Sequence, residues 1–384
     1  MSDVITPFHI EIDDAVLTDL RERLARTRWP EREAVDDWSQ GIPLAYLREV
    51  CEHWAGSYDW RARERLLNVV PQFRTSLHGG GDEPLGIHFL HARSPHPDAF
   101  PLVLTHGWPG STVEFMKVIG PLTDPVAHGG DAADAFHVVA PSLPGFGFSD
   151  KPARTGWGVE RIATAWDELM VRLGYERYGA QGGDWGSSVT TRIGAQNLGH
   201  CAGIHINMPI AGPSPDDMAD LTEFEVQALG RFQHYQNQDS GYSKQQSTRP
   251  QTVGYGLVDS PVGLAAWVLE KFWAWTDNDG YPDDAIHRDE LLDNVMMYWL
   301  NGTGASSARL YWESFSGFGG VVVDIPAGIS QFPKEIFAAS RRWADRAYTD
   351  IRHWNELDRG GHFAAFEEPD LLVDELRTFF RHVR

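Results

Sequence analysis

The sequence predicts an α/β protein with a mostly parallel central sheet, helices on both faces of the sheet, an inserted helical cap and an N-terminal helical extension. Three observations lead to this prediction. From about residue 100, short apolar runs alternate with helical segments, which is typical of parallel sheets covered on both faces. Residues 211–318 interrupt this alternation with helical and polar segments. Residues 1–95 precede it with amphipathic helices.

The segment 1–95 is expected to form the helical extension. Residues 13–28 repeat apolar side chains at helical spacing, begin with Asp13 as a candidate N-cap and end before Pro30. Four tryptophans recur through the segment and could present an apolar surface to a neighbouring part of the chain. Two further helices and a strand are expected over residues 44–54, 60–69 and 87–92.

Residues 96–210 and 319–384 are predicted to form the first and second parts of the α/β core. The expected strands cover residues 101–105, 136–140, 178–181, 321–327 and 348–356, and a helix is expected over 162–173. Helices of the cap are expected near residues 221–235 and 264–275. In such sheets ligands bind at the carboxyl ends of the strands. Two glycine-rich turns, at His106 and Asp184, come at these ends.

Composition limits the classes of function. The chain of 384 residues carries a net charge of −21, spread along its length, which argues against nucleic acid or an anionic membrane surface as a partner. Its two cysteines fit no metal or disulfide spacing, and a reducing compartment suits them. No signal-peptide pattern opens the sequence, and no apolar run approaches the ~20 residues of a membrane span. We therefore expect a cytoplasmic protein.

The run Gly182-Gly183-Asp184-Trp185-Gly186 is typical of a turn that exposes a nucleophile between a strand and a helix. Here the central residue is an aspartate. An aspartate after a strand is commonly a helix N-cap, but a capping role does not require glycines two residues away on both sides. A carboxylate nucleophile forms an ester with an alkyl carbon. The turn therefore favours the opening of an epoxide or the displacement of a halide.

A base and an orienting acid are expected downstream. His362 follows Gly360 and Gly361, and the chain order of nucleophile, acid and histidine is that of α/β-hydrolases. Glu335 is the favoured acid because it follows an expected strand; Asp324 and Asp358 are poorer alternatives.

The turn His106-Gly107-Trp108-Pro109 could complete an oxyanion hole. In α/β-hydrolases the loop after an early strand donates one backbone N–H, and the residue after the nucleophile donates the other. The predicted donors are the amides of Trp108 and Trp185, supported by motif residues His106, Gly107, Pro109, Gly182 and Gly186. Taken alone, the first turn could equally be an ordinary Gly-Pro turn.

Together these motifs resemble the microsomal-type epoxide hydrolases, which are α/β-hydrolases with an N-terminal extension. The ordered set covers nearly the whole chain and consists of Thr27-Arg-Trp-Pro, His106-Gly-Trp-Pro-Gly-Ser, Gly182-Gly-Asp-Trp-Gly-Ser, Ser247-Thr-Arg-Pro-Gln-Thr-Val-Gly, Asp259-Ser-Pro-Val-Gly-Leu-Ala-Ala and Gly360-Gly-His-Phe-Ala-Ala-Phe-Glu-Glu-Pro.

The resemblance implies a soluble, bacterial-type enzyme that converts an epoxide and water into a vicinal diol without a metal or cofactor. Asp184 would form a covalent hydroxyalkyl ester, and water activated by His362 and Glu335 would hydrolyse it. Two lid tyrosines, Tyr242 and Tyr311, would bind the epoxide oxygen.

Two rival functions remain open. A haloalkane dehalogenase would use Asp184 in the same way, with the Trp185 indole binding halide, but it would lack the extension and the lid tyrosines. A non-catalytic ligand-binding relative would have little use for an intact Asp, His and Glu set. Aromatic residues in the cap suggest a small-molecule epoxide that is bulky or aryl, and a homodimer is compatible with the sequence. The chain does not distinguish detoxification from biosynthesis.

Overall fold

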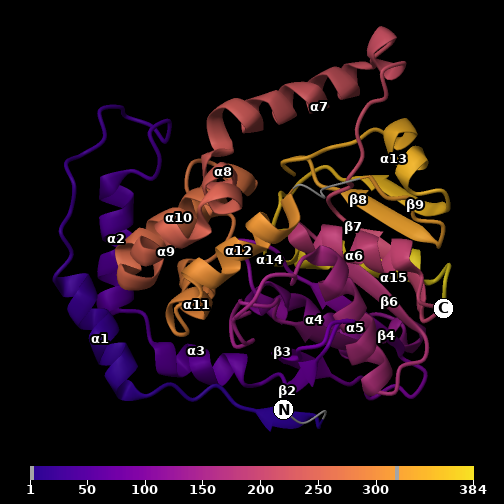
Figure 1. Ribbon diagram of the computed structural model, residues 1–384, viewed down its shortest axis with the longest axis horizontal. Coiled ribbons are helices and arrows are strands. Elements are labelled where there is room, and N and C mark those ends of the chain that lie inside the picture. Colours follow the sequence, from indigo (N-terminus) through magenta and orange to yellow (C-terminus); the bar gives the residue numbers. More distant parts are fainter. Residues whose placement is uncertain (1–3, 316–319) are drawn as a thin grey trace.

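The computed structural model describes residues 4–315 and 320–384, which are built around one nine-stranded sheet (Figure 1). The strand order is β1-β2-β3-β5-β4-β6-β7-β8-β9. The first three strands and the β3–β5 pair are antiparallel, and the remaining pairs are parallel. The strands are β1 (Thr6–Phe8), β2 (Gln72–Leu77), β3 (Leu85–Ala92), β4 (Phe100–Thr105), β5 (Phe136–Pro141), β6 (Tyr178–Gly182), β7 (Cys201–Ile206), β8 (Ala327–Gln331) and β9 (Ile351–Glu356).

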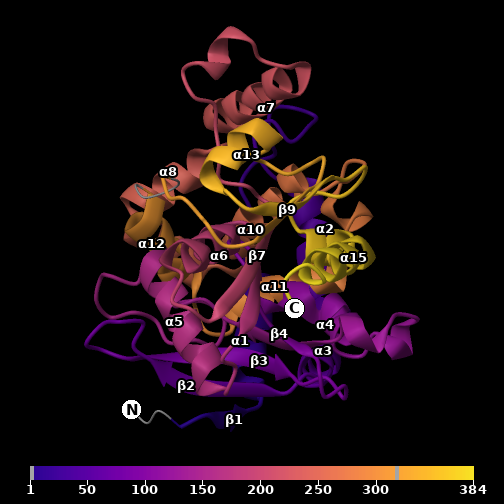
Figure 2. The same cartoon turned by 90° about the vertical axis from the view of Figure 1, so that its right-hand side faces the viewer.

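Both faces of the parallel part are covered by helices, because its strands are apolar on both sides. Along β4, Leu102 and Leu104 belong to a buried cluster with α4 (Met116–Thr123), α14 (Ala364–Glu367) and α15 (Pro369–Phe380). Val103, between them, points to the opposite face and packs with α5 (Val159–Arg172) and α6 (Trp185–Gln196). Figure 2 shows α5 and α6 on one side of the sheet and α4 and α15 on the other.

A helical cap lies above the carboxyl ends of the parallel strands. Its most separate helix, α7 (Glu223–His234), stands at the top of Figure 1, near α13 (Arg341–Ala347) of the core. The other cap helices are α8 (Gly241–Thr248), α9 (Pro250–Asp259), α10 (Pro261–Trp275), α11 (Arg288–Trp299) and α12 (Gly304–Ser314). Among the described residues, no single helix meets the length and hydropathy of a membrane span; the pair α9 and α10, bent by 115°, meets them only jointly.

The N-terminal extension contributes to both parts of the fold: its helices lie against the cap, and its strands β1, β2 and β3 form one edge of the sheet. Its helices α1 (Asp14–Ala25), α2 (Leu44–Gly56) and α3 (Trp60–Leu67) lie beside α9, α10 and α11 in Figure 1. Trp38 stacks on Trp273 with ring centroids 4.6 Å apart, so one of the recurring tryptophans does face a neighbouring segment. The Asp293 carboxylate of α11, 1% exposed, pairs with Arg63 at 2.8 Å and accepts from the Tyr58 hydroxyl at 2.7 Å. The buried charge of Asp293 in the cap is therefore paired with Arg63 in the extension.

Most of the expected elements appear within a few residues of their predicted bounds, but the strand at 321–327 is wrong. That segment makes only an isolated bridge from Val323 to Tyr348, and the strand itself begins at Ala327. Pro326 offers no N–H for a sheet ladder, and Val322 is 57% exposed, so the valine run does not enter the sheet. Strands β1, β2 and β7 were not predicted. The predicted boundary between residues 318 and 319 lies outside the described residues.

Candidate active site

Asp184 occupies the sharp turn between β6 and α6. Its backbone lies at φ 52° and ψ −127°, a conformation that a residue with a side chain rarely adopts. The residue stands at the N-cap position of α6, but its side chain makes no capping hydrogen bond. The turn therefore directs the carboxylate away from the helix, and the capping interpretation is not supported by its contacts.

Three glycines leave the space that this turn requires. A Cβ on Gly186 would lie 1.8 Å from the carbonyl oxygen of Thr105. One on Gly182 would lie 2.1 Å from the carbonyl oxygen of Gly186, and one on Gly107 would lie 2.1 Å from Oδ1 of Asp184. The close approach of backbone segments, rather than flexibility, explains the small residues around Asp184.

The two carboxylate oxygens of Asp184 face different groups. The backbone N–H of Trp108 donates to Oδ1 at 2.7 Å. Oδ2 lies 3.2 Å from Nε2 of His362. The contacts thus assign Oδ1 to an amide donor and leave Oδ2 beside the imidazole. The role of the second predicted donor, the amide of Trp185, stays a prediction.

Glu335 is the acid that contacts the histidine. The ring nitrogen Nδ1 of His362 lies 2.6 Å from Oε1 of Glu335, and both side chains are buried. The same oxygen accepts from the backbone N–H of Ile336 at 2.7 Å, which fixes the carboxylate. The two alternatives, Asp324 and Asp358, are exposed. The preference for Glu335 agrees with this geometry.

Electrostatics favour an ion pair between His362 and Asp184. Burial alone would lower the pKa of His362, but the carboxylates of Glu335 and Asp184 outweigh burial and hold that pKa well above the ordinary value. The imidazolium form is therefore stabilised as long as Asp184 carries its negative charge.

The turn that carries Trp108 is held from two sides. His106 is buried, and burial lowers its pKa to about 4, so a neutral ring accepts from the N–H of Leu143 at 3.2 Å. From the cap, the Asn294 amide donates to the carbonyl of Pro109 and the Tyr298 hydroxyl donates to that of Gly110, both at 2.7 Å. The amide donor for Asp184 is thereby fixed to both core and cap.

The structure brings the two lid tyrosines to the same cavity as Asp184. The rings of Tyr242 on α8 and Tyr311 on α12 meet edge to face with centroids 5.7 Å apart. Tyr242 also stacks on Trp108 at 4.9 Å. Burial raises the pKa of both phenols well above the ordinary value, so both remain protonated. Both tyrosines line the cavity that reaches Asp184, and their role in binding the epoxide oxygen stays a prediction.

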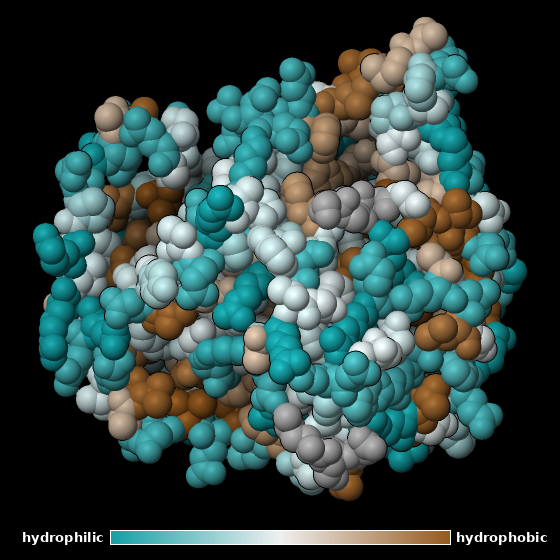
Figure 3. All heavy atoms as spheres, viewed as in Figure 1, coloured by the Kyte–Doolittle hydropathy of each residue, from teal (hydrophilic) through white to brown (hydrophobic). Residues whose placement is uncertain are grey.

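The cavity has a volume of about 580 Å³ and is mainly apolar. Its walls come from the segment after β7, from α7 and α8 of the cap, and from the segment before α13. Figure 3 shows hydrophobic residues gathered beside and below α7, the region from which this cavity is lined. Its polar lining residues include Asp184, Tyr235, Gln236, Tyr242 and Tyr311.

Two residues beside the site were missed by sequence reasoning. The hydroxyl of Tyr235 lies 3.0 Å from that of Tyr242, and nothing in the sequence distinguishes it from other cap aromatics. Glu114 is the acid of a capping box with Ser111, whose N–H donates to its Oε1 at 3.1 Å. The Ser-x-x-Glu spacing could have revealed Glu114.

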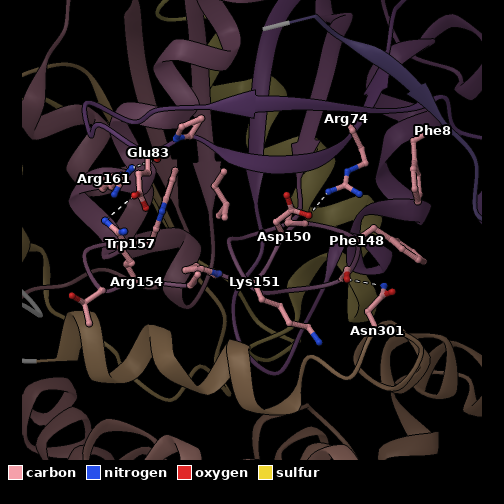
Figure 4. Close-up of a pocket in the computed structure, with 17 residues that line it drawn as sticks. Phe8, Arg74, Glu83, Phe148, Asp150, Lys151, Arg154, Trp157, Arg161 and Asn301 are labelled. Carbon is pink, nitrogen blue, oxygen red and sulfur yellow. Dashed lines mark hydrogen bonds and ion pairs between the residues drawn. The ribbon is translucent and has the colours of Figure 1, made fainter. Parts of the chain in front are cut away.

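A second cavity, of about 670 Å³, lies away from Asp184 (Figure 4). Its cations are held by neighbours: Arg74 pairs with Asp150 at 2.6 Å, and Arg154 pairs with Glu83 at 2.7 Å. Among the described residues, it shares no wall with the cavity at Asp184. No cluster of metal-ligating side chains occurs in the described part of the chain. The candidate site is therefore the one at Asp184.

Comparison with known proteins agrees with both the fold and the extension. A family described as "Epoxide hydrolase N terminus" matches residues 5–115, and one described as "alpha/beta hydrolase fold" matches residues 101–252. A putative epoxide hydrolase of Stigmatella aurantiaca is 56% identical, over 99% of this chain and 86% of its own length. Epoxide hydrolase 1 of Sus scrofa is 36% identical, over 98% and 88%.

A solved structure also matches the fold of this chain over its full length. The crystal structure of juvenile hormone epoxide hydrolase from Bombyx mori superimposes with a TM-score of 0.90 at 30% identity and covers 100% of this chain and 95% of that one. The predicted α/β-hydrolase fold is thereby confirmed.

Proposed function

Because this chain belongs to the epoxide hydrolase family of α/β-hydrolase-fold proteins, we propose that it converts an epoxide and water into a vicinal diol through a covalent ester on Asp184. One observation carries the covalent step. The two oxygens of Asp184 are differentiated, with Oδ1 bound by the Trp108 amide at 2.7 Å and Oδ2 beside His362 at 3.2 Å. Oδ2 is the nucleophile, and Oδ1 becomes the carbonyl oxygen of the ester.

In the first half-reaction, Oδ2 attacks one carbon of the epoxide ring in the apolar cavity. The carbon–oxygen bond of the ring breaks, and the leaving oxygen takes a proton from Tyr242 or Tyr311. The product is a hydroxyalkyl ester on Asp184. The protonated state of both buried phenols supports their role as donors.

Ester formation then removes one of the causes that raise the pKa of His362. Asp184 loses its negative charge, so one of the two carboxylates that raise the pKa of His362 no longer acts. The imidazolium releases its proton, and that proton restores the tyrosine. His362 becomes a base only after the ester has formed.

In the second half-reaction, His362 removes a proton from water, and the hydroxide oxygen bonds to Cγ of Asp184. The negative charge that develops on Oδ1 is stabilised by the Trp108 amide and, as proposed from the sequence, by that of Trp185. Each such donor is worth about 2.7–4 kcal/mol. The bond between Cγ and Oδ2 breaks, and Oδ2 leaves as an alkoxide that takes a proton from the His362 imidazolium and becomes one hydroxyl of the diol. The new carboxyl group of Asp184 gives its proton back to His362, which restores the carboxylate and the imidazolium.

The fate of Oδ2 provides the test. In a single turnover in heavy-oxygen water, with enzyme in excess, the diol should be unlabelled and Asp184 should gain the label, as measured by mass spectrometry of the peptide that contains it. A labelled diol from the first turnover would exclude the ester. Chloride release from a chloroalkane is the control for the dehalogenase alternative, which the relatives named above do not favour.

We further propose a bulky or aryl epoxide as substrate and a cytoplasmic location. The size and apolar walls of the cavity, about 580 Å³, support the first. The two buried, unpaired thiols of Cys51 and Cys201 support the second. A screen of terminal, aryl and disubstituted epoxides with chiral analysis of the diols would test the substrate class.

A further inference from the structure

A third, small cavity also reaches Asp184, in addition to the apolar cavity of about 580 Å³. Its volume is about 20 Å³, which is enough for a single water molecule. Its polar walls include Glu114, Gln181, Asn207 and His362. Among the described residues, Asp184 alone lines both this cavity and the apolar cavity of about 580 Å³. His362 lines only the small one.

We propose that this small cavity holds the water that hydrolyses the ester, and that Glu114, Gln181 and Asn207 position that water against Cγ of Asp184. The proposal rests on the covalent mechanism above and extends it. The epoxide would approach Asp184 from the cap, and the water would wait on the core side, next to the base.

The polar walls of the cavity match the needs of one water, which makes two to four hydrogen bonds when buried. Gln181 is 2% exposed, and its amide N–H donates to Oδ1 of Asn207 at 3.2 Å. Its Oε1 is buried and has no hydrogen-bond partner among the described residues. An acceptor left without a partner in a polar cavity is costly, so it favours a bound water.

Glu114 adds a donor on another side. One of its oxygens, Oε1, accepts from the backbone N–H of Ser111 at 3.1 Å, which fixes the carboxyl group. Burial, together with the charge of Asp184, raises the pKa of Glu114 to about 8, although His362 opposes the shift. The carboxylic acid form can therefore donate to a water while His362 accepts a proton from it. The proton that leaves the water goes to Nε2 of His362, and the remaining hydroxide bonds to Cγ.

The proposal separates the two half-reactions. Glu114→Met keeps the length of the side chain but cannot hydrogen-bond to water, whereas Glu114→Gln keeps a donor and an acceptor. With styrene oxide as the probe, acid-quenched single turnovers followed by mass spectrometry of the Asp184 peptide give the rates of ester formation and decay. For Glu114→Met we expect ester formation within about threefold of wild type and decay slowed by ~10- to 100-fold, in keeping with the effect of misplacing a reactant. Glu114→Gln should restore decay to within about threefold.

A second pair of variants tests the cavity without altering the Ser111 turn. Gln181→Met should also slow decay of the ester. Gln331→Met is the matched control, because Gln331 is a buried glutamine with an unpaired amide nitrogen that does not line the cavity. Its decay rate should be that of wild type.

Three results would overturn the proposal: wild-type decay in both Glu114→Met and Gln181→Met, equal slowing of both half-reactions in Glu114→Met, or slow decay in Gln331→Met. If no ester forms on Asp184 even in wild type, the covalent mechanism itself fails. That outcome is distinct from normal ester formation with unaltered decay.

Discussion

Nε2 of His362 lies 3.2 Å from Oδ2 of Asp184, so the base contacts the nucleophile before any substrate is bound. Against the effect of burial, Glu335 and Asp184 together hold the pKa of His362 well above its ordinary value, so the basicity of His362 depends in part on the charge of Asp184. In the proposed mechanism, loss of that charge on ester formation favours release of the proton from His362. Under that proposal, this contact sets the order of the two half-reactions.

Replacement of His362 by Gln should separate these half-reactions. Glutamine cannot accept the proton of water at neutral pH, so the ester on Asp184 should form and persist. We expect the intact variant to gain the mass of one epoxide after incubation with substrate, and steady diol release to fall by at least ~10²-fold. Asp184→Asn is the control and should gain no mass. An unmodified His362→Gln protein with full epoxide consumption would contradict the scheme.

The two lid tyrosines should affect the other half-reaction. Tyr242→Phe and Tyr311→Phe each remove one donor to the epoxide oxygen, and each should slow ester formation by ~10- to 100-fold with little change in ester decay. Stopped-flow quenching of tryptophan fluorescence can follow this step, because Trp108 and Trp185 pack against these tyrosines. Tyr46→Phe is a suitable control, since that buried hydroxyl bonds to Asp283, between the extension and η6 (Pro282–Asp284) of the cap. Wild-type rates in the double variant would exclude a role for the pair.

The parts of the site that the sequence predicts are those with strict backbone requirements. The turn at Asp184 needs glycine where backbone segments approach within contact distance, and this leaves a visible pattern at Gly182 and Gly186. His362 and Glu335 were found through chain order. Tyr235 and the small cavity have no such pattern, because they arise from tertiary packing of the π-helical turn (Tyr235–Asp239) and of several core segments that lie far apart in the sequence.

The wrong prediction of a strand at 321–327 also has a physical reason. A run of valines predicts a strand at 321–327, yet sheet membership depends on register with neighbours and not on apolar content alone. β8 pairs with β7 from Ala327 onwards, where Ile329 is fully buried. The short strands β1 and β2 were missed because their pattern of buried and exposed residues is irregular.

Gly186→Ala should destabilise the core. The new methyl group would lie 1.8 Å from the carbonyl oxygen of Thr105, and the backbone that carries Asp184 would have to move. We expect a loss of about 3 kcal/mol in the free energy of unfolding, measured by urea denaturation, together with loss of ester formation. Gly230→Ala is the matched helical control, because a Cβ there meets no atom within 4 Å. That change should leave stability equal or raise it slightly.

Acid should release α7 from the core through Glu225. This buried carboxylate pairs with Arg342 and accepts from Ser340 of the core, both at 2.6 Å. The Arg342 guanidinium, against the effect of burial, lowers the pKa of Glu225 to about 2. Because the folded pKa is depressed, the stabilisation is present above pH about 4.5 and is lost as the pH falls towards 2. Glu225→Gln should lower the melting temperature at pH 7 and reduce its dependence on pH in that window. An unchanged melting curve at pH 7 would contradict the prediction.

Decay of the ester should fall at alkaline pH because of Glu114. The charged or titratable groups that face it are His362, Asp184 and Tyr298. Burial raises its pKa to about 8 in the resting site, where the His362 cation lowers it and the charge of Asp184 raises it. In the ester Asp184 is neutral, and once His362 is neutral too its larger lowering effect is lost, so the pKa of Glu114 should not fall below that value. The donating acid form is present below this pKa and is lost above it. Hydrolysis of the ester should therefore rise with pH as His362 becomes neutral and then decline near or above pH 8.

Single-turnover decay rates between pH 5 and pH 10 can measure this profile in wild type and in Glu114→Gln. The glutamine side chain does not titrate, so its alkaline limb should disappear while the acidic limb, which belongs to His362, remains. A wild-type limb that persists unchanged in Glu114→Gln would assign the alkaline titration to another group, since only the carboxylic acid of Glu114 has been removed.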